Sequence, residues 1–124
     1  MSTKIIKGEI LSSGLSTYGL LRIIRSKKDF QLVNPKDIVY LSRNTIMGDG
    51  LLNIYNLAAK GVSGLITDIG GKPDHGTVIA SEFGIIRLLT APDRETEKQL
   101  KHLEGHEICI TNDGNILTAK SSPI

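Results

Sequence analysis

The hydrophobic positions of the chain fall into short runs that turn-forming residues separate. Short apolar or alternating runs bounded by Gly, Pro, Asn and Asp are typical of β-strands. They predict strands at residues 4–11, 19–25, 30–33, 38–41, 64–69, 85–89, 106–111 and 116–119. Residues 34–37, Asn-Pro-Lys-Asp, predict a turn. Asp113-Gly114 lies between the last two runs and predicts a hairpin.

Three further segments have the apolar spacing of helices. Residues 49–60 place apolar side chains on one helical face, with Asp49 as N-cap and Gly61 just past the C-terminus. Residues 75–83 and 93–103 predict two more helices. Strands come first, then strands and helices alternate, and a hairpin closes the chain. This order predicts an α/β domain with a mixed sheet and helices packed on it.

The composition fits one domain that spans residues 1–124. Hydrophobic residues make up 40% and charged residues 23%, which is ordinary for a globular protein. The net charge is only +2, and aromatic residues make up 4% with no Trp. Arg22, Arg25, Lys27 and Lys28 come closest to a basic cluster and are best explained as a solvated strand end and turn. We therefore expect no nucleic-acid partner.

The sequence shows no sign of secretion or membrane insertion. Its one cysteine, Cys109, excludes an internal disulfide and lies in an alternating apolar run, which predicts a small core residue. The N-terminus has no apolar stretch of signal-peptide length, and nothing approaches the length of a membrane span. We therefore expect a cytoplasmic protein with no membrane partner.

Residues 66–85 contain the pattern with the clearest chemistry. A buried strand ends at Gly70-Gly71, where glycine lets the backbone turn sharply and approach a ligand. His75 follows at or near the N-terminus of a predicted helix, whose unpaired N–H groups and positive partial charge attract phosphate. The same charge disfavours imidazolium, so the ring keeps the lone pair that a nucleophile needs. On spacing alone, such a histidine is more often a turn or cap residue.

This stretch resembles the signature of the phosphohistidine domain in enzymes that use phosphoenolpyruvate, such as phosphoenolpyruvate synthase and pyruvate phosphate dikinase. The family pattern runs Gly-Gly, two variable positions, Ser or Cys, His, a helix with Ala-Arg-Glu, and Gly-Ile-Pro. The matching positions are Gly70, Gly71, His75, Ala80, Glu82, Gly84 and Ile85. Residues 37–39 and 43–45 also resemble segments of that family, and the likeness covers nearly the whole chain.

The resemblance implies a swivelling β/β/α domain that carries a phosphoryl group on His75. The residues implied in phosphate binding are Gly70, Gly71, Lys72, Asp74, Gly76, Thr77 and Arg43. This domain itself would bind no metal or cofactor. Mg²⁺ and ATP or phosphoenolpyruvate would bind to partner proteins or domains, one for nucleotide and one for phosphoenolpyruvate or pyruvate. The chain would then be a component of a phosphotransferase rather than a complete enzyme.

Two departures from the family pattern leave alternatives open. Asp74 stands where the family has Ser, Thr or Cys, and a carboxylate beside a phosphoryl group is unfavourable unless it caps the helix instead. Ser81 replaces the usual Arg, so Lys72 or Arg43 would have to neutralise the phosphate. The main alternative is therefore a non-phosphorylated domain that acts as a regulatory or structural subunit. A subunit of an aconitase-like hydro-lyase is a second alternative.

A metal site is the least favoured interpretation. His102 and His106 lie four positions apart with Glu104 between them. Gly105 interrupts the helix that would place both rings on one face, so we expect no metal here.

Overall fold

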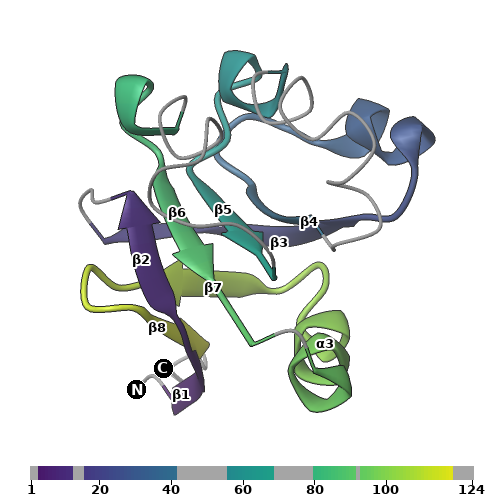
Figure 1. Cartoon of the computed structure of the whole chain (residues 1–124). Coiled ribbons are helices and arrows are strands. Elements are labelled where there is room, and N and C mark those ends of the chain that lie inside the picture. Colours follow the sequence, from purple (N-terminus) through teal and green to yellow (C-terminus); the bar gives the residue numbers. More distant parts are fainter. Residues whose placement is uncertain (1–2, 13–15, 42–55, 69–79, 92, 119–124) are drawn as a thin grey trace, which may run out of the picture.

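The structure is a computed structural model that describes residues 3–12, 16–41, 56–68, 80–91 and 93–118 (Figure 1). Its described strands form one mixed sheet in the order β1-β8-β7-β3-β4-β5-β6-β2. The strands are β1 Thr3–Lys7, β2 Glu9–Ser12, β3 Thr17–Ile24, β4 Ile38–Leu41, β5 Gly64–Thr67, β6 Ile86–Leu89, β7 Glu107–Ile110 and β8 Asn115–Thr118. The neighbours from β3 to β6 run parallel, and the other pairs run antiparallel.

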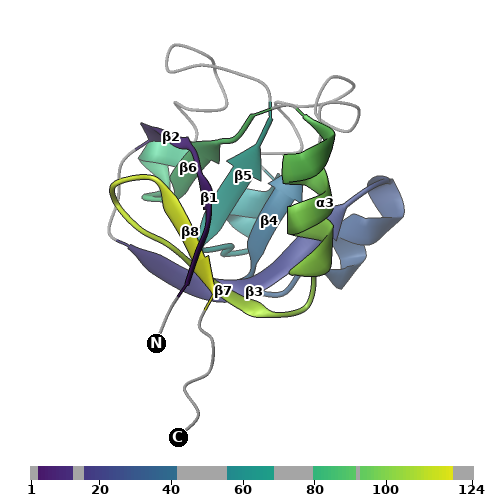
Figure 2. The same cartoon turned by 90° about the horizontal axis from the view of Figure 1, so that it is seen from below.

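The sheet curls until its two edges meet, as the view in Figure 2 shows. β1 and β2 form opposite edges of the sheet, yet only Gly8 separates them along the chain. The Gly8 N–H donates to the carbonyl oxygen of Gly114 at 2.8 Å. A Cβ on Gly8 would lie 2.5 Å from the carbonyl oxygen of Leu89, so only glycine fits between the edges. The predicted strand at 4–11 is therefore two strands, because the chain passes from one edge to the other at Gly8.

Two hydrophobic clusters fill the two sides of the parallel strands. Side chains alternate along a strand, so each strand contributes to both clusters. The inner cluster lies within the curled sheet and comprises Ile6, Leu21, Ile23, Ile38, Tyr40, Ile66, Ile86, Leu88, Leu100, Ile108, Ile110 and Ile116. The outer cluster comprises Ile24, Val33, Val39, Leu41, Leu57, Ala58, Val62, Leu65, Ala80 and Ile85.

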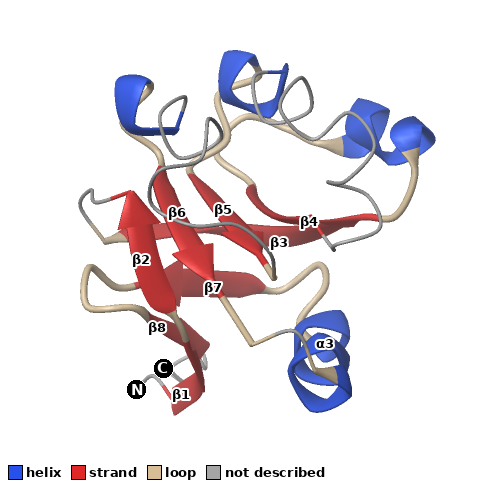
Figure 3. Cartoon of the chain, in the orientation of Figure 1, coloured by secondary structure: helices blue, strands red, loops and turns tan. Residues whose placement is uncertain are grey.

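Helical segments cover both clusters (Figure 3). The 3₁₀ helix η1 (Lys27–Leu32) and the helical turns at 56–59 and 80–82 lie over the outer cluster. Helix α3 (Arg94–His102) contributes Leu100 to the inner cluster and is otherwise largely polar. Asp93 caps it, because its carboxylate accepts from the Thr96 N–H at 2.8 Å, and these hydrogen bonds lower the pKa of Asp93.

The expected strand at 30–33 is wrong, because η1 occupies most of that range. The local reason is Asp29, whose carboxylate accepts from the backbone N–H groups of Arg25 at 2.7 Å and Ser26 at 3.2 Å. An acidic side chain that satisfies free N–H groups at a helix start stabilises a helical turn over an extended strand. Phe30 remains partly buried against the outer cluster.

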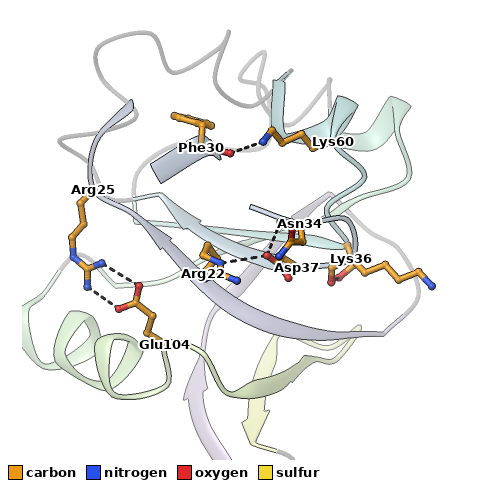
Figure 4. Close-up of polar contacts among 9 residues, drawn as sticks. Arg22, Arg25, Phe30, Asn34, Lys36, Asp37, Lys60 and Glu104 are labelled. Carbon is orange, nitrogen blue, oxygen red and sulfur yellow. Dashed lines mark hydrogen bonds and ion pairs between the residues drawn. The ribbon is translucent and has the colours of Figure 1, made fainter. Parts of the chain in front are cut away.

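Polar contacts fix the turn that leads into β4 (Figure 4). Asp37 is buried, and its Oδ2 accepts from the Asn34 N–H at 2.9 Å and from Arg22 Nε at 3.4 Å. Lys36 has a φ of 73°, which confirms the predicted turn at 34–37. Arg25 forms a two-point ion pair with Glu104 at 3.0 and 3.1 Å. Arg22 and Arg25 of the basic cluster are thus engaged in ion pairs.

The mixed-sheet α/β class predicted from the hydrophobic pattern is confirmed. The hairpin at 112–114 is also confirmed, with Gly114 at a φ of 93°. Cys109 is buried as expected, and burial raises the pKa of its thiol. Gly61 follows the helical turn at 56–59 with a φ of 86°, as predicted for a residue past a helix end. No helix within the described ranges is long and apolar enough to span a membrane.

Candidate functional site

The residues that the sequence nominates for phosphate chemistry lie outside the described part of the chain. They fall in residues 42–55 and 69–79 and are Arg43, Gly70, Gly71, Lys72, Asp74, His75, Gly76 and Thr77. The proposed cap at Asp49 lies in the first of these ranges as well. The structure does describe the residues that flank the segment 69–79, and these residues form the polar frame of the candidate site.

This polar frame lies at the carboxyl ends of three adjacent parallel strands, which we call the carboxyl edge. β4, β5 and β6 end side by side, with Leu41 opposite Thr67 and Thr67 opposite Leu89. Residues 69–79 follow β5 by one residue and precede the helical turn at 80–82. In α/β proteins, with open or closed sheets, ligands bind beyond the carboxyl ends of parallel strands, so the polar side chains at these strand ends are the ones to consider.

A buried tyrosine and an aspartate meet on the inner face of this edge. The Tyr40 hydroxyl donates to Oδ2 of Asp68 at 3.2 Å, and Tyr40 is only 2% exposed. Burial, followed by the nearby Asp68 charge, raises the pKa of Tyr40 well above its ordinary value, so the phenol stays a donor. The second oxygen of Asp68, Oδ1, is buried and has no hydrogen-bond partner. A buried acceptor without a partner is costly and calls for a donor.

A buried arginine lies on the other face of the same edge. Arg87 is 1% exposed in β6, and its Nε and Nη2 donate to Thr67 Oγ1 at 3.3 and 3.2 Å. Thr90 also contacts Thr67, because the Thr90 N–H donates to the Thr67 carbonyl oxygen at 2.9 Å. A buried guanidinium places a permanent positive charge beside the strand ends, because arginine does not lose its proton in proteins.

The two groups are separated by the sheet itself. Thr67 shares the outer face with Leu65, whereas Asp68 bonds to Tyr40 of the inner cluster. The carboxyl edge therefore has the Arg87 guanidinium on its outer face and the Asp68 carboxylate on its inner face. This arrangement can orient a polar group or an anion held beyond the strand ends.

Sequence reasoning missed both groups. The signal for Arg87 was a charged residue inside the apolar run 85–89, which a buried strand admits only with partners. The signal for Asp68 was an acidic residue directly after a buried strand. Tyr40 gave no signal, because a tyrosine in an apolar strand is normally a core residue.

The structure also describes the region of His102 and His106, where the sequence predicts no metal site. α3 stops at His102, and Gly105 has a φ of 83°. Glu104, the third member of the group, is held by Arg25, and this hydrogen bond lowers the pKa of Glu104. Across the described ranges, no group of three or more His, Cys, Asp or Glu side chains could hold a metal ion.

The chain is similar to a curated protein in sequence and to solved structures in fold. No protein-family model matches the chain. The chain is 30% identical over 109 residues to an uncharacterized phosphotransferase, YvkC, of Bacillus subtilis strain 168. The match covers 86% of this chain but only 12% of that protein. Aconitase X of Thermococcus kodakaraensis has a similar structure, with a TM-score of 0.56 and 16% identity, over 94% of this chain and 97% of that one.

These findings correct the family expected from residues 66–85. The expected family was the phosphohistidine domain of phosphoenolpyruvate-using enzymes. That assignment is wrong, because an aconitase X is a structural neighbour and the sequence match is an uncharacterized phosphotransferase. The physical reason is that a strand, a Gly-Gly turn and a following helix are local features that unrelated families on one fold can share. The likeness to aconitase X shows the fold alone.

Proposed function

We propose that this chain takes part in phosphoryl transfer and that His75 is the residue that accepts the phosphoryl group. The observation that carries the proposal is the similarity to the Bacillus subtilis phosphotransferase, which extends over 86% of the chain. The chain spans only 12% of that relative, so the similarity is to one part of a much longer protein.

The choice of His75 rests on imidazole chemistry and on its place in the sequence. Of the three histidines, His102 and His106 flank the C-terminal end of α3, far in sequence from the strand edge. His75 lies in the segment that joins β5 to β6, between two fixed points at Asp68 and Ala80. A connection between parallel strands is where α/β proteins place their ligand-binding residues.

The proposed step is an in-line displacement. A neutral imidazole nitrogen of His75 forms a bond to phosphorus while the bond from phosphorus to the donor's leaving atom breaks and that atom keeps the electron pair. Catalysis of such a step consists mainly of positioning and charge stabilisation. We assign positioning of the phosphate to backbone N–H groups of Gly70, Gly71 and Gly76 and to Thr77.

Charge stabilisation falls to the cations of the same two segments, Lys72 and Arg43. Asp74 is assigned to capping the helix rather than to contact with the phosphate, because two like charges repel. The donor and the final acceptor bind to other proteins or domains, as expected for one part of a larger phosphotransferase. We propose the cytoplasm as the place of this reaction.

The test uses phosphoramidate, a small phosphoryl donor that needs no protein partner. The full chain is incubated with it, and the labelled residue is mapped by mass spectrometry under alkaline conditions. The proposal predicts an acid-labile, base-stable adduct on His75 that forms at least about tenfold faster than any adduct on His102 or His106. His102→Gln and His106→Gln serve as matched controls and keep the label, whereas His75→Gln loses it. Equal labelling of all three histidines, or none at His75, rejects the proposal in favour of a non-phosphorylated structural or regulatory role.

A further inference from the structure

We propose that one uncovered face of the sheet binds a second copy of this chain. The face comprises the outer side of β1, β8, β7 and the first half of β3, residues 17–20, and we call it the open face. The helical segments of the outer layer pack on the outer cluster, to which no described residue of β1, β7 or β8 belongs. In Figure 3 these segments lie at the top and β7 and β8 at the bottom, while α3 packs on the inner cluster.

The strand register places an apolar row at the centre of the open face. Alternation back along β3 from Ile24 of the outer cluster puts Leu20 and Tyr18 on the outer side. Tyr18 pairs with Cys109 of β7, and Cys109 pairs with Leu117 of β8, so these three side chains share one face. Tyr18 is 63% exposed and Leu20 is 44% exposed. Neighbouring apolar side chains that remain exposed within a polar rim mark a surface for contact with protein.

Opposite charges stand at opposite corners of the open face. Glu107 of β7 pairs with Leu20 at one end of the apolar row and is exposed. Lys7 of β1 follows Ile6 of the inner cluster, so it points outward, and it is exposed at the other end, beside the hairpin. There the Thr111 hydroxyl and, to a smaller extent, the Lys7 charge lower the pKa of Asp113.

A second copy is the occupant that this pattern fits. A two-fold contact brings the same patch of both molecules together, so the patch must complement itself. The apolar row then meets its own copy at the centre. A two-fold axis that exchanges the corners sets Lys7 of one molecule against Glu107 of the other. The net charge of +2 adds little repulsion between the copies.

The size of the open face predicts a weak, reversible dimer. Four strands about 4.8 Å apart, with about five residues of about 3.4 Å each, give a flat area of roughly 300 Å². Even twice that area, to allow for projecting side chains, stays below the roughly 800 Å² that each partner buries in a standard interface. Smaller interfaces belong to transient complexes, so we expect association only at high protein concentration.

Sedimentation equilibrium of the full chain measures this association between about 10 µM and about 1 mM. We expect monomers at the low end and a monomer–dimer equilibrium at the high end. Tyr18→Lys places a charge in the apolar row and raises the dissociation constant at least about tenfold. Leu32→Lys is the matched control, because Leu32 is 58% exposed on η1, outside the open face, and this variant leaves the dissociation constant unchanged.

Charge reversal distinguishes a second copy from any other occupant. Glu107→Lys alone and Lys7→Glu alone each raise the dissociation constant about two- to fivefold at low salt, because the facing charges become alike. The double variant Glu107→Lys/Lys7→Glu returns to the wild-type value, and an equimolar mixture of the two single variants favours the mixed dimer.

Three results would each overturn the inference. A chain that stays monomeric at every concentration leaves the open face to a different protein. A dimer that Tyr18→Lys weakens no more than Leu32→Lys forms through another surface. A double charge variant that associates no better than the single variants shows that the two corners do not face each other.

Discussion

Leu100 is the point at which helix α3 is attached to the rest of the molecule. It is the buried residue of α3, it is fully inaccessible to solvent, and it packs into the inner cluster. Replacing a buried Leu by Ala costs about 2.7–5 kcal/mol, and the cost falls where the surroundings can collapse into the cavity. The rest of α3 is exposed or partly exposed and can move inward, so we expect about 3 kcal/mol for Leu100→Ala.

Urea unfolding followed by circular dichroism measures this loss. With an m-value of about 1–3 kcal/mol/M, the midpoint falls by roughly 1–3 M while the m-value stays constant. Leu20→Ala is the control, because Leu20 is 44% exposed and its truncation changes stability by about 0.5 kcal/mol or less. A loss below about 1 kcal/mol for Leu100→Ala would show that Leu100 does not anchor α3 on the inner cluster.

Three further predictions test the closure of the sheet and its polar contacts. Gly8→Ala places a Cβ 2.5 Å from the Leu89 carbonyl oxygen and lowers stability by about 1–3 kcal/mol; an unchanged urea midpoint contradicts the closure. Glu104→Gln loses the pair with Arg25. Because the folded-state pKa of Glu104 is lowered, the loss, below about 1 kcal/mol, is present at pH 7 and vanishes as pH falls below about 4; a pH-independent difference between the two melting temperatures refutes this. The pKa of Tyr40 is raised on folding, so its contribution is complete below about pH 10 and is lost progressively as the pH rises from there toward the higher folded-state pKa. Wild-type stability therefore falls more steeply above about pH 10 than that of Tyr40→Phe, and parallel pH profiles contradict the expectation.

The sequence predicted the elements whose signals are local. The hairpin at 112–114 and the helix predicted at 93–103 appear as expected, because turn preferences and helical periodicity act over a few residues. The buried strands at 38–41 and 64–69 also appear, the second two residues shorter at its end. Their continuous apolar runs leave few alternatives.

One wrong expectation arises where distant segments decide the outcome, and another arises where a neighbouring polar side chain outweighs the apolar pattern. The run at 4–11 alternates like one strand, and only the tertiary closure at Gly8 divides it. The apolar residues at 30–33 suit a strand, but Asp29 satisfies the free N–H groups of a helical turn. Helix and strand preferences are weak, and such contacts override them.

The polar frame of the candidate site also depends on distant pairing. Tyr40 and Asp68 are 28 positions apart, and Arg87 and Thr67 are 20 apart. Only the register of parallel strands brings each pair together. A single sequence without related sequences does not reveal such pairings, whereas His75 could be nominated because its glycine and helix signals are adjacent.

Under the proposed function, His75 carries a phosphoryl group in the cell. The most direct measurement is mass-spectrometric mapping of the protein isolated from its native cells in the cold at alkaline pH. A portion of phosphoramidate-labelled protein, carried through the same isolation, shows that phosphohistidine survives. We expect phosphohistidine at residue 75 and none at residues 102 and 106. An unmodified His75 under every growth condition, with the labelled standard intact, would contradict it.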